Sequence, residues 1–577
     1  MARFKRVLIL DGYTDEPAGF GVPPYLDVYP RYIAGAIWSV DKTVSIRYMT
    51  VDQARRNIHN FLKQANTYDL LVVIAGAIVP GKYLGGEPIT LQELQTWFRL
   101  IDRPFKVLAG AAARWGIGNI GGTVAALPRT VKENFDVIVA GEPEAYIYEL
   151  FRFGEEKAHP WSIIDDENLA PLAEFSRLGA RIVTQHPNYG YNLIAEIETY
   201  RGCPRWISGG CSFCATKLYG RPRQRKVEDV VKEVEALYKA GVRHFRIGRQ
   251  ADIMTYGSNE LAEKEWPRPN PEAIRRLFYG IRVVAPGLQT LHIDNVNPGT
   301  IVRYEEESIE ILKIIIQYHT PGDVAALGIE TADPRVVKAN NLKTYPEESL
   351  RAIEIINKYG NRPGYNGLPE LLPGINFVLG LIGETKETYR LNEEFLRRIY
   401  EKGLNVRRIN VRKVLILPNT VLAKYGTKII EKHLKSAKRF ERQALNYSRL
   451  FLERLVPRGT ILRYLYVEKY DPQLKVTFAR QAGSYPLVVE IPCKIEVKAV
   501  IDVYIYAHSS RSVRGLPIPL NPNNTPLSIL TRIVGPEVAR KIISQRPFKS
   551  DIELRKIIGT TGHKGLLSIK GHTCVFS

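Results

Sequence analysis

The sequence is poor in sulfur, because its 577 residues include only five cysteines and three methionines. So few cysteines in a chain of this length cannot form the disulfide framework of a small secreted protein. Three of them, Cys203, Cys211 and Cys214, lie within a dozen residues, whereas Cys493 and Cys574 stand alone. The clustering indicates a metal site formed by the three neighbouring thiols.

Long apolar runs are also absent. The longest, such as residues 70–74 and 311–316, are far shorter than the roughly 20 residues that cross a bilayer. The apolar run after the basic N-terminus stops at Asp11 after four residues, and a signal peptide needs a longer one. We therefore expect a cytoplasmic protein with no membrane partner.

Negative charge is scarce relative to positive charge, with 60 Asp and Glu against 81 Lys and Arg, a net charge of +21. Such an excess favours a polyanionic partner, above all nucleic acid. The charged surface of a thermophilic protein explains the same excess and agrees with the three methionines and 31 tyrosines. Net charge alone leaves both explanations open.

The first 185 residues predict an α/β domain with a parallel sheet. Apolar strands are expected at 6–10, 70–75, 106–109 and 137–140, with a helix at 29–38. This pattern is typical of a Rossmann-like, doubly wound domain. The motif G-x-G-x-x-G is missing between the first strand and helix, which argues against a dinucleotide.

Residues 186–425 predict a second β/α series. Its strands are expected at 195–200, 244–247, 290–294, 324–329, 374–379 and 411–415, with an amphipathic helix at 227–239. Six such units indicate an incomplete (β/α)6 barrel, with its chemistry at the C-terminal ends of the strands.

The remaining chain predicts three smaller parts. Residues 426–457 form a basic helical connector, with a helix expected at 431–454, and the alternating strands of 458–515 indicate a small β-barrel. The tail from residue 509 is expected to be helical, with a unit at 516–577 that includes a helix at 548–558. Residues 509–577 contain 11 Lys and Arg against 3 Asp and Glu.

The three clustered cysteines have the spacing C-x7-C-x2-C in the loop after the first strand of the second series. Three thiolates on a [4Fe–4S] cube leave one iron without a protein ligand, free for a chelating molecule. Gly202, Gly209 and Gly210 would let the backbone wrap closely around it. A Cys3His zinc site completed by His186 or His244, and three unrelated buried thiols, are the alternatives.

Four segments in order resemble the radical S-adenosylmethionine (SAM) superfamily. They are Cys211-Ser-Phe-Cys214, Leu327-Gly-Ile-Glu-Thr331, Val378-Leu-Gly-Leu-Ile-Gly-Glu-Thr385 and Leu417-Pro-Asn-Thr420. The chain departs from the family in having seven residues, not three, between its first two cysteines. Ile382 stands where proline is usual, and Gly248-Arg249-Gln250 stands in place of a G-G-E segment.

The resemblance implies a [4Fe–4S] cluster on Cys203, Cys211 and Cys214, SAM as co-substrate and a low-potential electron donor. It implies SAM contacts at four further residues: Phe213, Gly248, Arg249 and Glu330. Glu330 is also the candidate catalytic residue, in contact with SAM or the substrate. The alternative is a strand-end glutamate that pairs with an arginine.

The flanking parts also resemble known modules. Residues 1–185 resemble the cobalamin-binding domains of some radical SAM proteins, but D-x-H-x-x-G is absent, which leaves cobalamin unsupported. The whole plan resembles the tRNA methylthiotransferases, with 458–515 similar to their TRAM barrel. Those enzymes have three N-terminal cysteines for a second cluster, and this chain has no cysteine before Cys203.

Residues 527–543 resemble a helix-hairpin-helix, as in uncharacterised archaeal radical SAM proteins that have this motif at their C-terminus. Gly535 at the hairpin, with Arg540 and Lys541, would bind a nucleic-acid phosphate. A packing module is the alternative. The leading hypothesis is a radical SAM enzyme that modifies tRNA or another nucleic acid. The alternatives are a radical SAM enzyme acting on a small metabolite or cofactor, and a non-catalytic, metal-stabilised nucleic-acid-binding protein.

Overall fold

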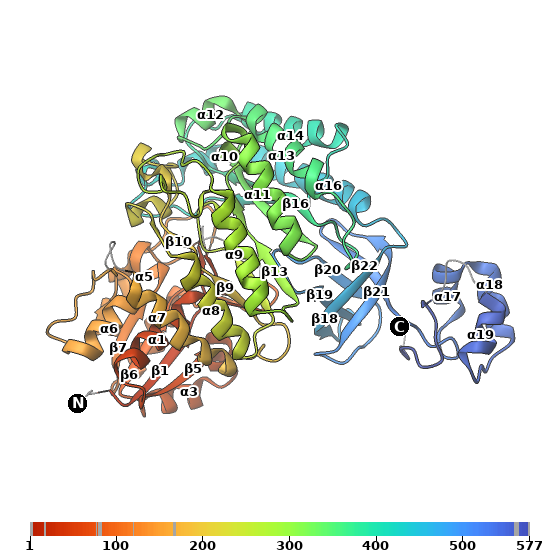
Figure 1. Ribbon diagram of the computed structural model, residues 1–577, viewed down its shortest axis with the longest axis horizontal. Helices are drawn as coiled ribbons and strands as arrows, with labels where there is room; N and C mark the ends of the chain where they lie inside the picture. Colours follow the sequence, from red (N-terminus) through yellow and green to blue (C-terminus); the bar gives the residue numbers. More distant parts are fainter. Residues whose placement is uncertain are drawn as a thin grey trace.

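The computed structural model describes residues 4–16, 19–76, 78, 83–118, 120–164, 169–558 and 565–574. An N-terminal α/β part, a larger β/α core and a C-terminal β-barrel pack together, and three short helices lie beyond the barrel (Figure 1). No helix in the described part of the chain combines the length and apolarity needed to span a bilayer.

The N-terminal sheet is entirely parallel, with the strand order β5-β1-β6-β7-β8. Its strands are β1 (Arg6–Asp11), β5 (Ser45–Thr50), β6 (Leu70–Ile74), β7 (Phe105–Ala109) and β8 (Val137–Ile138). The four predicted strands are confirmed, and the edge strand β5 was not predicted.

Helices cover both faces of this sheet, because successive side chains of a strand point to opposite sides. Val7 and Ile9 share a core with α1 (Val28–Val40), whereas Leu8 and Leu10 pack on the other side with α2 (Val51–Arg56). The other helices of the two layers are α3 (Ile58–Ala65), α4 (Leu91–Thr96), α5 (Ala111–Trp115), α6 (Pro143–Phe153) and α7 (Ala170–Gly179). The sheet is therefore doubly wound.

The core contains all six predicted strands as two parallel sheets, β13-β12-β9-β4 and β14-β15-β16-β17. They are β9 (Ile194–Ile197), β12 (His244–Ile247), β13 (Thr290–Ile293), β14 (Asn295–Val296), β15 (Asp323–Glu330), β16 (Leu371–Leu379) and β17 (Arg408–Lys413). Asp294 alone separates β13 from β14, so these two form the third strand of the series. The N-terminal part adds β4 (Tyr25–Leu26) to the edge of β9.

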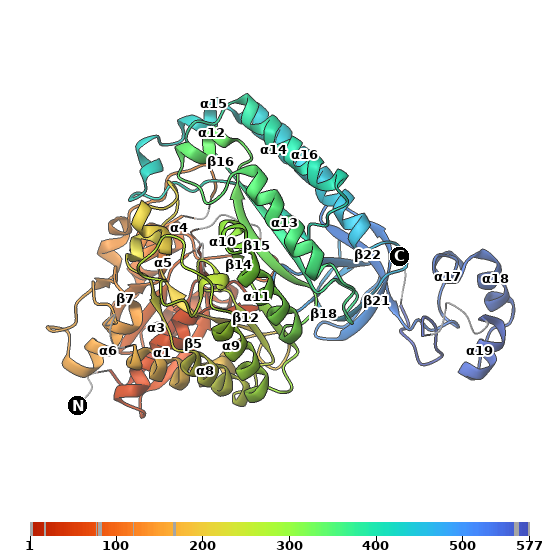
Figure 2. The same ribbon diagram turned by 45° about the horizontal axis from the view of Figure 1, so that its top comes forward.

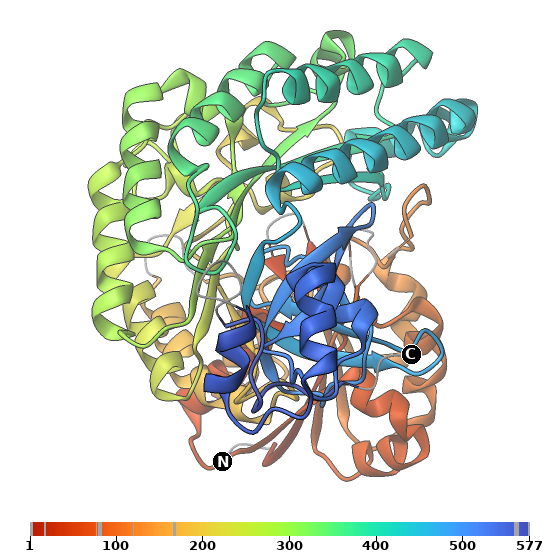
Figure 3. The same ribbon diagram turned by 90° about the vertical axis from the view of Figure 1, so that its right-hand side faces the viewer.

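The helices of the core form an arc around its strands (Figure 3). They are α8 (Val227–Lys239), α9 (Pro271–Val284), α10 (Pro298–Arg303), α11 (Glu305–Tyr318), α12 (Pro334–Ala339), α13 (Pro346–Gly360) and α14 (Lys386–Glu401). The predicted connector helix is divided into α15 (Lys428–Lys432) and the long α16 (Leu434–Leu455), which runs from the top of the core towards the barrel (Figure 2).

The C-terminal barrel is closed, with the strand order β18-β19-β20-β22-β21. Its strands are β18 (Ile461–Asp471), β19 (Val476–Gln481), β20 (Val488–Ile491), β21 (Val500–His508) and β22 (Ser512–Ile518). The expectation of helix from residue 509 onwards is wrong over β22. That strand pairs with both β20 and β21 and closes the barrel.

The hairpin between β19 and β20 locks the barrel against the core. Ser484 donates its backbone N–H to His292 Nδ1 over 2.8 Å and its hydroxyl to the Ile293 carbonyl over 2.7 Å. The Tyr25 hydroxyl of β4 donates to the Gly483 carbonyl of the same hairpin. Three parts of the chain therefore meet at this hairpin.

The tail forms α17 (Leu527–Val534), α18 (Pro536–Ser544) and α19 (Asp551–Ile558), the last shorter than the predicted helix at 548–558. Cys493 and Cys574, which stand far apart in the sequence, form a disulfide with a Cα–Cα distance of 5.6 Å. The expectation that these two cysteines stand alone is therefore wrong. The disulfide ties the end of the tail to the barrel.

Candidate active site

The cysteine loop follows β9 and the short strand β10 (Tyr200–Arg201), at the C-terminal edge of the core sheet. Cys203 precedes a 3-10 turn, Pro204–Ser208, and the chain then reverses through two left-handed glycines, Gly209 at φ 81° and Gly210 at φ 59°. Residues with a Cβ rarely adopt these angles, so the sequence needs glycine here. A second turn joins the Cys214 N–H to the Cys211 carbonyl over 3.2 Å.

All three thiols line one cavity of about 80 Å³. A single water needs about 10–15 Å³, so this space is several times larger. The other lining residues come from loops after four different strands and include Arg205, Thr216, Ala251, Asp252, Thr255, Glu265, Asn295, Asn297, Thr300 and Lys343. Three unrelated thiols in a packed core would leave no such space, so this alternative is not supported.

Two cations influence the thiols. The Arg205 guanidinium donates to the Cys211 sulfur over 3.4 Å and is held by Glu265 at 3.0 Å. Burial raises the pKa of Cys203 to about 12, and the neighbouring Cys214 and Cys211 thiols add to the effect, whereas Lys343 opposes it. A buried thiol of this kind becomes a thiolate only when a metal displaces its proton.

The zinc alternative required a histidine as fourth ligand. His244 Nδ1 lies 2.9 Å from the Thr290 hydroxyl and Nε2 lies 3.2 Å from the Tyr466 hydroxyl. His186 Nδ1 accepts the Asn188 backbone N–H over 3.1 Å. Neither histidine lines the cavity. Within the described ranges, no three His, Cys, Asp or Glu side chains are grouped to hold one metal ion.

Glu330 ends β15 in an unusual backbone conformation, with φ 68° and a shift of register between Gly328 and Glu330. Its carboxylate lies near the Lys343 ammonium, as the surroundings of Gly328 show. A Cβ atom added to Gly328 would lie 2.5 Å from Glu330 Oε1 and 2.6 Å from Lys343 Nζ. Burial raises the pKa of Glu330 to about 7, and Lys343 and Arg412 oppose the rise. No arginine in the described part of the chain forms an ion pair with it, which disfavours the alternative of a simple Glu–Arg pair.

The other predicted SAM contacts lie in different places. Phe213 packs between two apolar clusters that include Val336 and Leu422. Gly248 and Arg249 do not line the thiol cavity, whereas the next residues of the segment, Ala251 and Asp252, do. The sequence resemblance located the segment, but the side chain of Arg249 points elsewhere.

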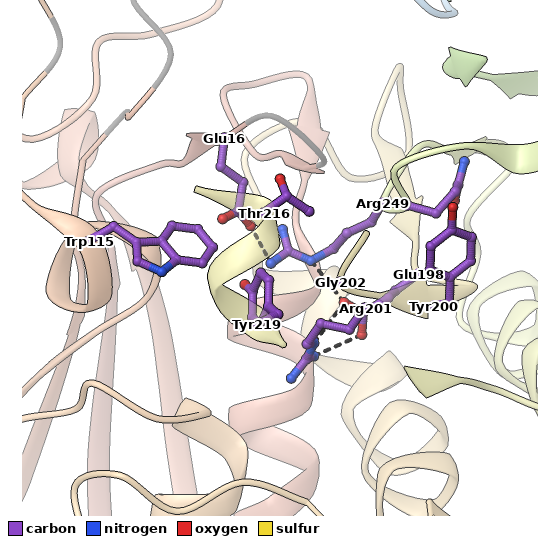
Figure 4. A pocket seen from close by; sticks show the side chains of 10 residues that line it. Glu16, Trp115, Glu198, Tyr200, Arg201, Gly202, Thr216, Tyr219 and Arg249 are labelled. Atoms are coloured by element: carbon purple, nitrogen blue, oxygen red, sulfur yellow. Dashed lines mark hydrogen bonds and ion pairs between the residues drawn. The ribbon is translucent and has the colours of Figure 1, made fainter. Parts of the chain in front are cut away.

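Arg249 joins the core to the N-terminal part (Figure 4). Its guanidinium pairs with Glu16, with Asp27 at 3.1 Å and with Glu198 at 3.2 Å, and it lies over the Tyr29 ring at 4.4 Å. Three carboxylates already satisfy this cation. It therefore holds two parts of the chain together and is not available to a ligand.

The predicted phosphate contacts lie at the far end of the molecule. The Gly535 N–H donates to the Thr531 carbonyl over 3.1 Å, so it is not free for a phosphate. Lys541 pairs with Glu537 at 3.2 Å in the first turn of α18, where a negative side chain opposes an anion. Arg540 is exposed. The helix–glycine–helix geometry is present, but only Arg540 of the three remains uncommitted.

Comparisons with known proteins agree with the sequence motifs. Residues 197–396 match the family model of the radical SAM superfamily. An uncharacterised protein of Methanocaldococcus jannaschii is 43% identical over 522 residues, which cover 88% of this chain and 93% of that protein. The chain belongs to the radical SAM superfamily.

More distant similarities cover parts of the chain. A probable threonylcarbamoyladenosine tRNA methylthiotransferase of Archaeoglobus fulgidus is 25% identical over 245 residues, which cover 42% of this chain and 49% of that protein. The radical SAM methyltransferase TsrM of Kitasatospora setae, solved with tryptophan and a SAM analogue, has a TM-score of 0.47 at 15% identity, over 72% of this chain and 75% of that one.

The cavity fits the cluster and SAM that a radical SAM enzyme uses. Its three thiols approach from one loop, and each can bind a different iron of a cube. The other lining residues offer a carboxylate, amide and hydroxyl groups and the Lys343 ammonium, which suit the amino, carboxylate and ribose groups of SAM. The cations Arg205 and Lys343 offset the negative charge of the thiolates.

The layer between the N-terminal part and the core does not fit cobalamin. It is closed by an edge-on contact of Trp115 with Tyr219 at 4.8 Å and by Arg201, which pairs with Glu142 at 2.7 Å and Glu144 at 2.9 Å. The cavity there has about 10 Å³, the room of one water, and no histidine lines it. The cavity lined by these described residues cannot hold a corrin ring.

Among the polar residues of the cavity that the sequence missed are Arg205, Asp252 and Lys343. Each lies in a loop after a core strand, where barrel enzymes place their chemistry. That rule indicates the loops but does not select the side chains. Arg205 gave the clearest signal, because a cation two residues after the first cysteine is suited to a thiolate.

Proposed function

We propose that this radical SAM enzyme holds a [4Fe–4S] cluster on Cys203, Cys211 and Cys214 and modifies a nucleic acid, tRNA or another structured RNA. When bound, the cluster supplies the electron that cleaves SAM to methionine and a 5′-deoxyadenosyl radical, which takes hydrogen from the substrate. A low-potential donor must deliver that electron.

The residues of the chain orient and shield this chemistry. Arg205 donates to Cys211 and offsets thiolate charge. Asp252 is fixed by the Thr300 hydroxyl at 2.7 Å and the Asn297 N–H at 3.0 Å, which gives the SAM-facing wall a rigid carboxylate. Glu330 and Lys343 stand together beside Gly328, where they can hold a polar group of the substrate.

A row of unpaired cations carries the nucleic-acid part of the proposal. We call it the basic ridge; it runs from the end of the core along α15 and α16. Its members are all exposed and have no carboxylate within ion-pair distance in the part of the chain that the structure describes: Lys424, Lys428, Lys432, Lys435, Lys438, Arg439 and Arg442. Four of them repeat at helical spacing on one face of α16.

The neighbouring helix α14 shows the opposite arrangement. Each arginine of this helix is paired: Arg390 with Glu387 at 2.6 Å, Arg397 with Glu401 at 2.7 Å and Arg398 with Glu347 at 2.7 Å. A thermophile surface is expected to carry such paired charges. The unpaired ridge therefore favours a polyanionic partner as the reason for its charge.

The ridge also lies in a suitable place. The Leu422 N–H donates to the Ser212 carbonyl over 3.1 Å, which ties the start of this segment to the cysteine loop. From there α16 leads towards the C-terminal barrel (Figure 2). An RNA along the ridge would have one part beside the cavity and another beside the barrel. The relative that acts on tRNA, named above, supports RNA over DNA.

Binding of total tRNA tests this proposal. We expect the triple variant Lys435→Gln, Lys438→Gln, Arg442→Gln to weaken binding and to lower the slope of log affinity against log salt by about 2–3. The matched control is Arg390→Gln, Arg397→Gln, Arg398→Gln, which removes the same charge from α14. Equal effects of the two variants, or no tRNA binding by the wild type, would contradict a specific nucleic-acid site on the ridge.

A further inference from the structure

We call the two parallel sheets of the core the core barrel, and its inner side is partly accessible to solvent along β16 and β17. On β17, Ile409 faces outwards and is buried beneath the helices. The alternate residues face inwards, and they stay partly accessible on both strands: Asn376, Val378, Arg408, Asn410 and Arg412. By contrast, every residue of β12 is buried. Solvent therefore enters the barrel on the β16–β17 side.

In the described part of the chain, no carboxylate lies within ion-pair distance of Arg408 on this wall, although Asp294 and Asp15 act on it from farther away. Its guanidinium lies over the Tyr485 ring at 3.9 Å, and no hydrogen bond or ion pair involves it in the described part of the chain. Burial lowers the pKa of Arg408. Arg246 on β12 differs, because Glu196 at 2.6 Å and Asp294 neutralise it. None of the Arg408 nitrogens is both buried and without a hydrogen-bond partner, so water can reach the guanidinium and a ligand can take the place of that water.

On the same strand, Arg412 faces inwards like Arg408, and Asn410 lies between them on that side. Its nearest carboxylate is Asp15, with Nη1 3.7 Å from Oδ2, which is beyond hydrogen-bond distance. The same Asp15 oxygen accepts the Tyr83 hydroxyl over 2.8 Å. Asp15 therefore acts on both arginines without a hydrogen bond to either, so their N–H donors remain available to a ligand. Arg412 also acts electrostatically on Glu330 and opposes the rise of its pKa.

We propose that Arg408 and Arg412 bind an oxyanion of the substrate, a carboxylate or a phosphate, inside the barrel. The inference rests on the proposed function, because it takes this barrel as the place where the substrate is held. Two guanidinium groups on one side of a strand can each offer a fork of N–H donors to such a group. The bound anion neutralises Arg408 and positions the rest of the substrate towards Glu330 and SAM.

The test is a titration of the full-length, anaerobically reconstituted protein with inorganic phosphate and, separately, with acetate at 150 mM NaCl. Isothermal calorimetry gives the dissociation constants. We expect millimolar binding of at least one anion by the wild type, and about a tenfold or greater loss with Arg408→Gln and with Arg412→Gln. Lys413→Gln is the matched control, because it removes one charge from the outward face of the same strand.

The outcomes separate the sources of the anion. Arginine-dependent binding of phosphate indicates a nucleotide group, and arginine-dependent binding of acetate alone indicates a carboxylic acid. No binding, binding unchanged in both arginine variants, or an equal loss with Lys413→Gln overturns the proposal. Arg408→Lys and Arg412→Lys keep the charge but lose the fork, so partial binding by them shows that a loss in the Gln variants is not misfolding.

Failure of the proposed function would look different. Deoxyadenosine formation by the same wild-type preparation reports the cluster and SAM, whereas the anion titration reports the two arginines. A preparation that binds phosphate through Arg408 but cleaves no SAM keeps the anion site and removes the radical chemistry. A preparation that cleaves SAM but binds neither anion keeps the radical chemistry and removes the anion site.

Discussion

The Arg205 guanidinium donates a hydrogen bond to the Cys211 sulfur over 3.4 Å, while its Nε holds Glu265 at 3.0 Å. Cys211 belongs to the same loop as Arg205, and Glu265 belongs to a neighbouring loop. A cation donating to a thiolate stabilises the more negative, reduced state of a cluster. The contact therefore bears directly on how easily the enzyme accepts its electron.

Arg205→Gln is expected to lower the midpoint potential of the cluster by roughly 30–60 mV, equivalent to about 1 kcal/mol for one electron. A redox titration followed by electron paramagnetic resonance measures it. Arg221→Gln, an exposed arginine after the same loop, is the control and should leave the potential unchanged. An unchanged potential in Arg205→Gln would show that the guanidinium does not act on the cluster.

Asp11 gives the N-terminal sheet a pH-dependent stability. Burial raises its pKa to about 7 from an ordinary 3.8, although the Tyr48 hydroxyl and the Tyr13 N–H donate to it. The folded state holds its proton more tightly than the unfolded state, so stability is lost as the pH rises from about 4 to 7. Between pH 4 and 8, the free energy of unfolding of Asp11→Asn should rise relative to that of the wild type by on the order of 3 kcal/mol.

Thermal unfolding of both proteins across this range measures the difference. The wild type and Asp11→Asn should diverge progressively up to about pH 7 and run parallel above it. Parallel curves throughout would show that the Asp11 carboxylate is already ionised in the folded protein at low pH.

The disulfide between Cys493 and Cys574 predicts a thiol count. Denatured apoprotein kept unreduced should react with three equivalents of a thiol reagent, and with five after reduction. Because the bond closes a loop of 81 residues, Cys574→Ser should destabilise the barrel and tail by about 2–4 kcal/mol. Five reactive thiols before reduction would contradict the pairing.

The core strands were predictable because buried parallel strands read as short apolar runs. This is why the six strands of the barrel were expected where they are found. The edge strand β5 was missed because its sequence SIRYMT alternates exposed and buried residues. β22 was missed because Gly515 and Pro517 interrupt its apolar pattern, although both residues belong to the strand that closes the barrel.

Only the part of the site whose residues lie close together in the sequence was predictable. Three cysteines within one loop identify themselves, whereas Lys343 reaches the same cavity from a loop more than a hundred residues away. Arg249 was expected at SAM from its position in a motif, but Glu16 and Asp27 of another part of the chain capture it. The pairing of Cys493 with Cys574 depends on the same kind of long-range contact.

Reductive cleavage of SAM tests the central claim most directly. Anaerobically reconstituted protein, reduced with dithionite and supplied with SAM, should form 5′-deoxyadenosine, and Cys203→Ala, Cys211→Ala and Cys214→Ala should each abolish it. Cys493→Ala, which removes a cysteine outside the cavity, should still form the product. Product formation that persists in the three cavity variants, or a wild-type preparation that binds zinc and no iron, would contradict the account.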